Sequence, residues 1–92
     1  MSESDYGRLA GRLSFLYYTN GEYELAKKWG FVAADAKSEY GLWSMGLLYF
    51  KEQKYKEAQK YFSQILDLTQ INNARKTEAA FWAGRAADIN GD

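Results

Sequence analysis

One spacing of apolar and small residues recurs along this chain of 92 residues, and it constrains the fold more than any other feature. The middle copy consists of Leu42, Met45, Gly46 and Tyr49, followed by Tyr55, Ala58 and Phe62. The first copy lies before it and consists of Ala10, Leu13, Ser14 and Tyr17, followed by Gly21, Tyr23 and Ala26. The third copy lies after it and consists of Ala80, Ala83, Gly84, Ala87 and Gly91. Recurrence of this kind indicates a stack of similar supersecondary units.

The first four members of each copy lie at positions i, i+3, i+4 and i+7, which is the spacing of one face of an α-helix. The chain contains no proline, so every part of it is free to be helical. We expect an all-α fold of five helices, at about residues 2–19, 22–36, 39–52, 55–68 and 74–89. Ser2 and Asp5 have the spacing of a capping box, and Asn20 or Gly21 is expected to be left-handed at the end of the first helix. The links of two to five residues make consecutive helices antiparallel neighbours.

The repeated small residues have a physical role in this scheme. Gly46 and Ala58 are expected where the two helices of a hairpin cross most closely, with large side chains such as Phe62 filling the volume around the crossing. For the second helix the inner stripe is Tyr23, Ala26, Trp29 or Gly30, and Ala33. For the fourth helix it is Tyr55, Ala58, Phe62, Ile65 and Leu66. We also expect Trp29 and Trp82 to lie in the core.

The middle copy, Leu42 to Tyr49 with Ala58 and Phe62, resembles a tetratricopeptide repeat (TPR). The resemblance implies one TPR-like domain over residues 1–92, built as a short right-handed α-solenoid. Repeat one spans about 6–37, repeat two about 38–72, and a half repeat or capping helix about 74–90. The copies depart from the family in the unequal distances between them, in Gly30 at an aromatic position, and in the missing proline. The stretches Ala26–Trp29 and Tyr40–Tyr49 are closer to the Sel-like sister family, which shares the architecture.

The last helix carries a second resemblance. The segment Ala79–Ala87 is similar to helices in the superhelical domain of soluble lytic murein transglycosylases, which place such helices before a separate catalytic domain. This resemblance implies an alternative in which the chain is a non-catalytic scaffold segment of a larger cell-envelope enzyme. That alternative would place the chain in the periplasm, whereas the composition leaves the compartment open and slightly favours the cytoplasm.

Composition excludes several classes of function. With no Cys and no His, the chain lacks thiol nucleophiles, zinc sites of the usual kind and the commonest acid–base residue. Twelve basic residues balance twelve acidic ones, so no electrostatic footprint for nucleic acid is present. No run of about 18 apolar residues exists to cross a membrane. The acidic pairs Glu22 with Glu24 and Asp35 with Glu39 flank helix ends, where acids cap and solvate. We therefore expect no enzyme activity, no metal and no cofactor.

The candidate binding site follows from the architecture that the resemblance implies, because the first helix of each hairpin lines a concave groove there. The outward positions of these helices hold more aromatic and arginine residues than a purely solvated face would. The candidate peptide-binding residues are Arg8, Arg12, Phe15, Tyr18, Tyr40, Trp43, Leu47, Phe50, Phe81 and Arg85. An open alternative is that these aromatic rings pack on neighbouring helices as core.

The expected function is a protein-interaction module or scaffold that binds a peptide or a helix in this aromatic groove. The arginines would pair with a carboxylate of the ligand. An oligomerisation module is a further alternative, because an unpaired fifth helix is expected to leave an apolar edge through which a homo-oligomer could form. Under the groove hypothesis, Trp43→Ala should weaken binding and leave stability nearly unchanged.

Overall fold

The computed structural model describes residues 3–68 and 71–91 of the chain. Five helices occupy this part: α1 (Glu3–Thr19), α2 (Tyr23–Asp35), α3 (Glu39–Lys51), α4 (Tyr55–Leu66) and α5 (Asn73–Asn90). The described residues contain no strand, so the all-α prediction is confirmed and each predicted helix is present. The capping role predicted for Ser2 lies outside the described residues. At the other end, Asn72 caps α5 by accepting a hydrogen bond from the Arg75 backbone N–H at 2.8 Å.

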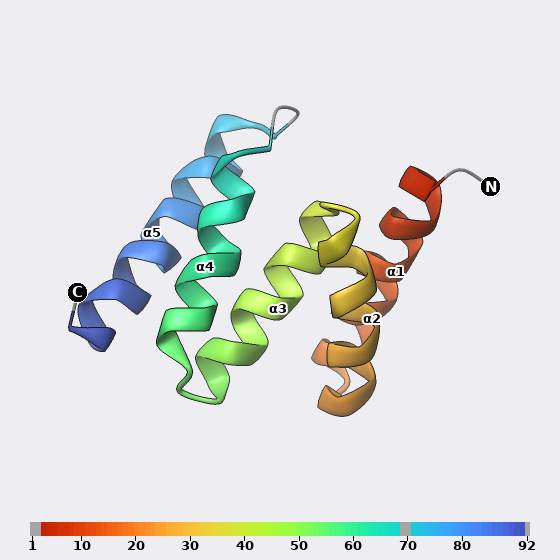
Figure 1. The fold of residues 1–92 in the computed structure, drawn as a ribbon, viewed down its shortest axis with the longest axis horizontal. Helices are drawn as coiled ribbons and strands as arrows, with labels where there is room; N and C mark the ends of the chain where they lie inside the picture. Colours follow the sequence, from red (N-terminus) through yellow and green to blue (C-terminus); the bar gives the residue numbers. More distant parts are fainter. Residues whose placement is uncertain (1–2, 69–70, 92) are drawn as a thin grey trace.

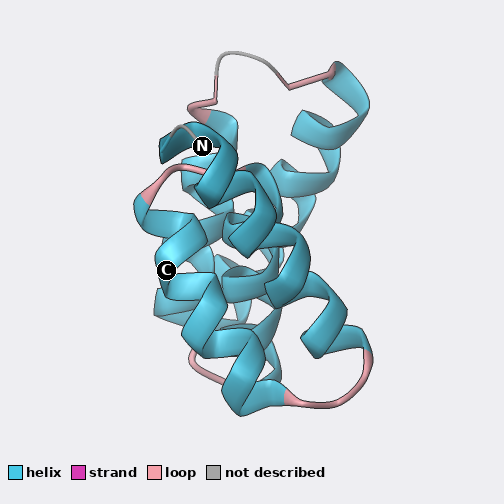
Figure 2. Cartoon of the chain, turned by 90° about the vertical axis from the view of Figure 1, so that its right-hand side faces the viewer, coloured by secondary structure: helices cyan, strands magenta, loops and turns pink. Residues whose placement is uncertain are grey.

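The helices follow one another in space in the order in which they follow in sequence (Figure 1). Each helix packs against the next one, and α3 also packs against α1, so α3 closes one side of the α1–α2 hairpin. The hairpin and α5 lie at opposite ends of the longest axis, which measures 42 Å. Figure 2 shows the short loops that join antiparallel neighbours. The right-handed solenoid that the TPR resemblance implies remains a prediction.

The first three turns share one backbone conformation. Gly21, Lys37 and Gln53 all have a positive φ, of 81°, 59° and 64°. In each turn the next residue's N–H reaches back to the carbonyl four residues before the left-handed position, as Glu22 does to Tyr17 at 2.9 Å. This is the Schellman arrangement, which satisfies carbonyls that the helix end leaves free. The three positions are evenly spaced along the sequence, so each helix plus its turn is one structural unit.

The main core cluster takes its large buried side chains from α3 and α4, with small residues of α2 and α5 beside them. Its largest fully buried side chains are Phe62, Leu42, Met45, Leu48 and Ile65. Gly46 is small for the predicted reason, because a Cβ at this position would lie 2.5 Å from Cε1 of Phe62. Ala58 is also fully buried, as predicted for the helix crossing. Trp82 of α5 packs against this core while remaining partly accessible.

The α1–α2 hairpin is built differently, because its buried positions are all small. Ala10, Ser14, Ala26, Gly30 and Ala33 are buried between the helices or against α3. Ser14 Oγ donates a hydrogen bond of 2.6 Å to the Ala26 carbonyl, which satisfies the buried hydroxyl. A Cβ at Gly30 would meet the sulfur of Met45, so a side chain from α3 fills the space that an aromatic fills in the second hairpin.

Three predictions about the core are wrong, for one geometrical reason. Gly30 is the inner residue of its pair, whereas Trp29 is half-buried and lies outside the main core cluster. One residue turns a helix by about 100°, which is enough to carry Trp29 toward the side away from α3. Tyr23 is 38% exposed and Leu66 is 36% exposed, because each lies at the margin of the stripe that its helix buries.

Candidate functional site

Within each of α1, α3 and α5 the predicted site residues share one side of the helix, and these three sides together are called here the α1–α3–α5 face. Helical spacing aligns them within each helix, since steps of three and four residues return to the same side. Six of them are half-buried, namely Phe15, Tyr18, Tyr40, Trp43, Leu47 and Phe50, and four are exposed, namely Arg8, Arg12, Phe81 and Arg85. None of the ten is fully buried, so the face combines packing with accessible surface.

At the α1–α3 junction the structure brings three of these rings together. The ring of Phe15 lies edge-on to Tyr40 at a centroid distance of 6.0 Å and tilted to Tyr18 at 6.3 Å. Tyr18 extends the cluster to Tyr23 of α2 at 5.8 Å. These distances lie within the range of favourable aromatic pairs, so the cluster both joins the helices and presents ring surface.

At the α3–α5 junction the rings continue into the core. Trp43 packs edge-on against Phe62 at 5.6 Å, and Phe50 packs edge-on against Trp82 at 5.2 Å. Phe81 contacts the neighbouring Trp82 at 5.8 Å and is 59% exposed. Trp43 therefore supports the core as well as the surface, and truncating it would change stability and the face together. The same rings therefore pack on neighbouring helices and present accessible surface, so the two alternatives, groove and core, do not exclude each other.

The positive charges of this face are available to a ligand. Arg8, Arg12 and Arg85 are exposed, and none of them pairs with a carboxylate in the part of the chain that the structure describes. Guanidinium groups bind carboxylates through two parallel hydrogen bonds. Arg75 of α5 is instead committed to the fold, since its Nη1 lies 2.7 Å from Glu39 Oε2 of α3.

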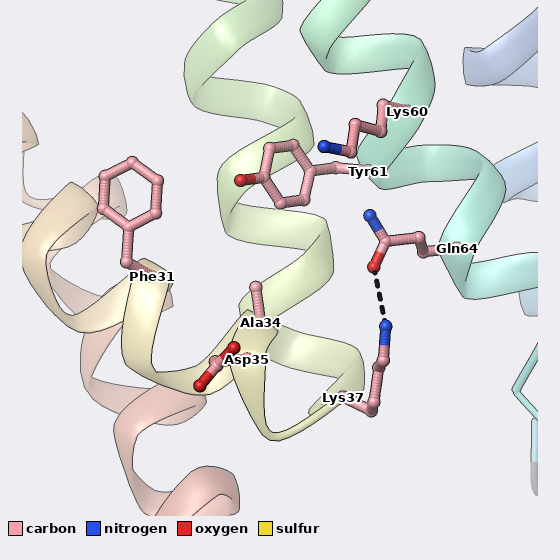
Figure 3. A pocket seen from close by; sticks show the side chains of 7 residues that line it. All are labelled: Phe31, Ala34, Asp35, Lys37, Lys60, Tyr61 and Gln64. Carbon is pink, nitrogen blue, oxygen red and sulfur yellow. Dashed lines mark hydrogen bonds between the residues drawn. The ribbon is translucent and has the colours of Figure 1, made fainter.

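A hollow that sequence reasoning missed lies on the other side of α3, between α2 and α4 (Figure 3). Its volume is about 570 Å³, and its lining residues are Phe31, Ala34, Asp35, Lys37, Lys60, Tyr61 and Gln64. Lys37 Nζ donates a hydrogen bond of 3.3 Å to Gln64 Oε1 across one side of it. Burial raises the pKa of the Tyr61 hydroxyl, and the neighbouring Tyr49 adds to the shift. The one sequence feature that could have indicated this hollow is Phe31, an aromatic residue that lies outside the inner stripe of its helix.

The same side of the molecule carries an ion pair between the hairpins. Lys27 Nζ lies 2.7 Å from Glu52 Oε2 and 5.0 Å from the centre of the Tyr49 ring. The hydrogen bond to Glu52 raises the pKa of Lys27, and the same bond lowers the pKa of Glu52. Stacked rings of Tyr49 and Tyr61, 5.6 Å apart, continue this arrangement toward the hollow.

Two kinds of site are absent from the described residues. Nowhere among residues 3–68 and 71–91 do three His, Cys, Asp or Glu side chains gather as a metal ion would need. No helix in this part of the chain has the length and apolar character required to cross a bilayer. Comparison of the chain with family models, curated proteins and solved structures finds no match.

Proposed function

We propose that this chain is a protein-interaction module that binds a peptide or a helix along the α1–α3–α5 face. The observation that carries the proposal is the row of Tyr40, Trp43, Leu47 and Phe50 on α3, which neither α1 nor α5 covers completely. Large apolar side chains that stay accessible in this way are typical of interaction surfaces. Tyr, Trp and Arg are also the residues that most often dominate binding energy.

The chemistry of the face supports a ligand of one kind, an extended peptide or a helix with apolar side chains and a carboxylate. From Tyr40 to Phe50 the row extends about 15 Å along the helix axis, which matches four or five residues of extended peptide or about three turns of a helix. Apolar side chains of the ligand would lie over this row. A carboxylate of the ligand would pair with Arg85 near α5 or with Arg8 and Arg12 on α1.

The test is a selection from a displayed peptide library, followed by affinity measurements on variants. Phe81→Ala and Arg85→Ala are preferred to Trp43→Ala, because Phe81 and Arg85 are exposed and their truncation leaves the core intact. We expect the double variant to bind selected peptides at least about tenfold more weakly than the parent, the cost of losing roughly 1.4 kcal/mol of contact.

Phe31→Ala is the matched control, because Phe31 is 47% exposed but lies on α2 beside the hollow. This control should bind as the parent does. Loss of binding in Phe31→Ala alone would move the site to the α2–α4 side. Selection of no peptide by the folded parent would contradict the proposal and favour a purely structural role.

A further inference from the structure

The hollow between α2 and α4 has polar groups of opposite character on its two sides (Figure 3). The α2 side carries the carboxylate of Asp35. The α4 side carries the ammonium of Lys60, the hydroxyl of Tyr61 and the side-chain amide of Gln64. Neither Asp35 nor Lys60 forms an ion pair within the part of the chain that the structure describes. The hollow therefore holds a carboxylate and an ammonium that stand apart without neutralising each other.

The α2 side concentrates negative charge at the end of a helix. Asp35 is the last residue of α2, and the last turn of this helix contains no basic residue. Because the C-terminal end of a helix already carries a partial negative charge, a carboxylate there is unfavourable for the helix itself. Lys37 follows two residues later, but its ammonium donates to Gln64 Oε1 at 3.3 Å. A bound cationic group would gain from both the carboxylate and the helix end.

The α4 side is instead suited to an anionic group. Lys60 is exposed and offers its ammonium. Burial raises the pKa of the Tyr61 hydroxyl, so this group stays protonated near neutral pH and can donate a hydrogen bond. Gln64 keeps its amide N–H groups for a ligand, because Lys37 occupies its oxygen. A carboxylate accepts hydrogen bonds from all three kinds of donor.

The net charge around the hollow favours neither an anion nor a cation. Residues 20–38 and 52–68, which include α2, α4 and the turns beside them, hold six acidic and six basic side chains. Among those outside the lining, Lys27 pairs with Glu52, and the charge of Glu24 also acts on Lys27. Glu57 and Asp67 of the α4 region do not line the hollow. Separation of charge across the hollow, and not an excess of one sign, is what a ligand would recognise.

The width of the hollow sets the length of a ligand that reaches both sides. Packed helices lie about 8–10 Å apart, and α3 contacts both α2 and α4, so the axes of α2 and α4 are at most about 20 Å apart. Side chains extend about 5 Å from each axis, which leaves a gap of at most about 10 Å. An extended chain of two or three residues spans roughly 7–10 Å. The volume of about 570 Å³ is also in the range of small-ligand sites.

We propose that this hollow binds a short zwitterionic peptide of two or three residues. Its amino group pairs with Asp35 at the end of α2, and its carboxylate accepts hydrogen bonds from Lys60 and Tyr61. Phe31 is 47% exposed and provides the ring surface for an apolar side chain of the peptide. This site is separate from the α1–α3–α5 face and does not depend on the proposed function.

The test is a titration of the isotope-labelled protein with the dipeptide alanylphenylalanine, followed by the amide resonances of the backbone. We expect a dissociation constant on the order of 0.1–1 mM, with the shifting resonances in α2 and α4. N-acetylation of the dipeptide removes its ammonium, and C-amidation removes its carboxylate. Because the charged side chains of the hollow are exposed, each modification should weaken binding about threefold to fivefold.

Substitutions in the protein assign each end of the dipeptide to one side of the hollow. Lys60→Met should weaken the free dipeptide about threefold to fivefold but leave the affinity for the C-amidated form unchanged. Asp35→Asn should do the same for the free dipeptide and leave the N-acetylated form unchanged. Lys56→Met is the matched control, because Lys56 is also an exposed lysine of α4 but lies outside the lining, and it should bind as the parent does.

An absence of shifts in α2 and α4 at about 10 mM dipeptide, well above the expected dissociation constant, would overturn the inference. Equal affinity for the free and N-acetylated dipeptides would also overturn it, because the hollow would then recognise only an anion. Phe81→Ala combined with Arg85→Ala, the double variant of the α1–α3–α5 face, should bind the dipeptide as the parent does. This inference and the proposed function can therefore fail separately.

Discussion

The two ends of this molecule use apolar residues in opposite ways. In the α1–α2 hairpin the buried positions are small, such as Ser14 and Gly30, and the large side chains, such as Leu16, lie on the surface. Toward α5 the large side chains are inside, since Phe62 is fully buried and Trp82 packs beside it. The comparison teaches that helical spacing indicates which residues share a side of a helix, while only a neighbouring helix makes that side a core.

The difference between the two ends of the molecule should have its largest effect on stability in a matched pair of tryptophan truncations. Trp82→Ala removes a ring that contacts Phe50 at 5.2 Å and Phe62 at 6.0 Å, so it should lower the free energy of unfolding by about 3 kcal/mol. Trp29→Ala, outside the core cluster, should cost only about 1 kcal/mol. Chemical denaturation in dilute solution measures both values. Equal costs would mean that the two ends are equally well packed.

A second pair of substitutions compares two glycines. In Gly41→Ala the new Cβ would meet the Cβ of Ala33 and lie 2.9 Å from the Ala34 backbone nitrogen, where backbone must move. This overpacking between α3 and the hairpin should cost about 1–3 kcal/mol. Gly84→Ala on α5 meets nothing within 4 Å, so it should stabilise by about 0.5–1 kcal/mol through helix propensity. Thermal unfolding that moves in the same direction for both would contradict this account.

The smallest expected change in stability comes from breaking the ion pair between α2 and the end of α3. The pKa of Glu52 is lowered from its usual 4.5, so the pair's contribution is present above that pH and is lost as the pH falls and Glu52 protonates. The pKa of Lys27 is raised from 10.5, so the contribution is also lost at high pH, as Lys27 deprotonates. Because both groups are partly exposed, Lys27→Met should cost only about 0.2–1 kcal/mol near neutral pH.

Urea unfolding at several pH values tests how the stabilisation by the Lys27–Glu52 pair depends on pH. The difference between parent and Lys27→Met should be present at pH 7 and should shrink below about pH 4 as Glu52 protonates. Glu39→Gln, which breaks the pair with Arg75 that joins α5 to α3, provides the comparison at the other end. A difference in Lys27→Met that stays constant with pH would show that lost packing, and not charge, is responsible.

Much of the fold was predictable because it depends on local physics. The five helices, the left-handed Gly21 and the small residue at Gly46 follow from periodicity, turn chemistry and the space at a crossing. The residues of the α1–α3–α5 face were predictable as one side of each helix. The accessibility of Trp43 was not, because Phe62, which partly covers its ring, belongs to the next helix and is distant in the sequence.

By itself the sequence determined the helices and which of them are neighbours along the chain, since these depend on residues three or four apart and on short links. Only the tertiary structure decided which apolar side each helix buries. Leu16 and Phe62 belong to equally regular apolar patterns, yet Leu16 is 54% exposed and Phe62 is 0% exposed. The difference is physical: α4 lies between two helices, α3 and α5, whereas nothing in the described chain packs on the outer side of α1.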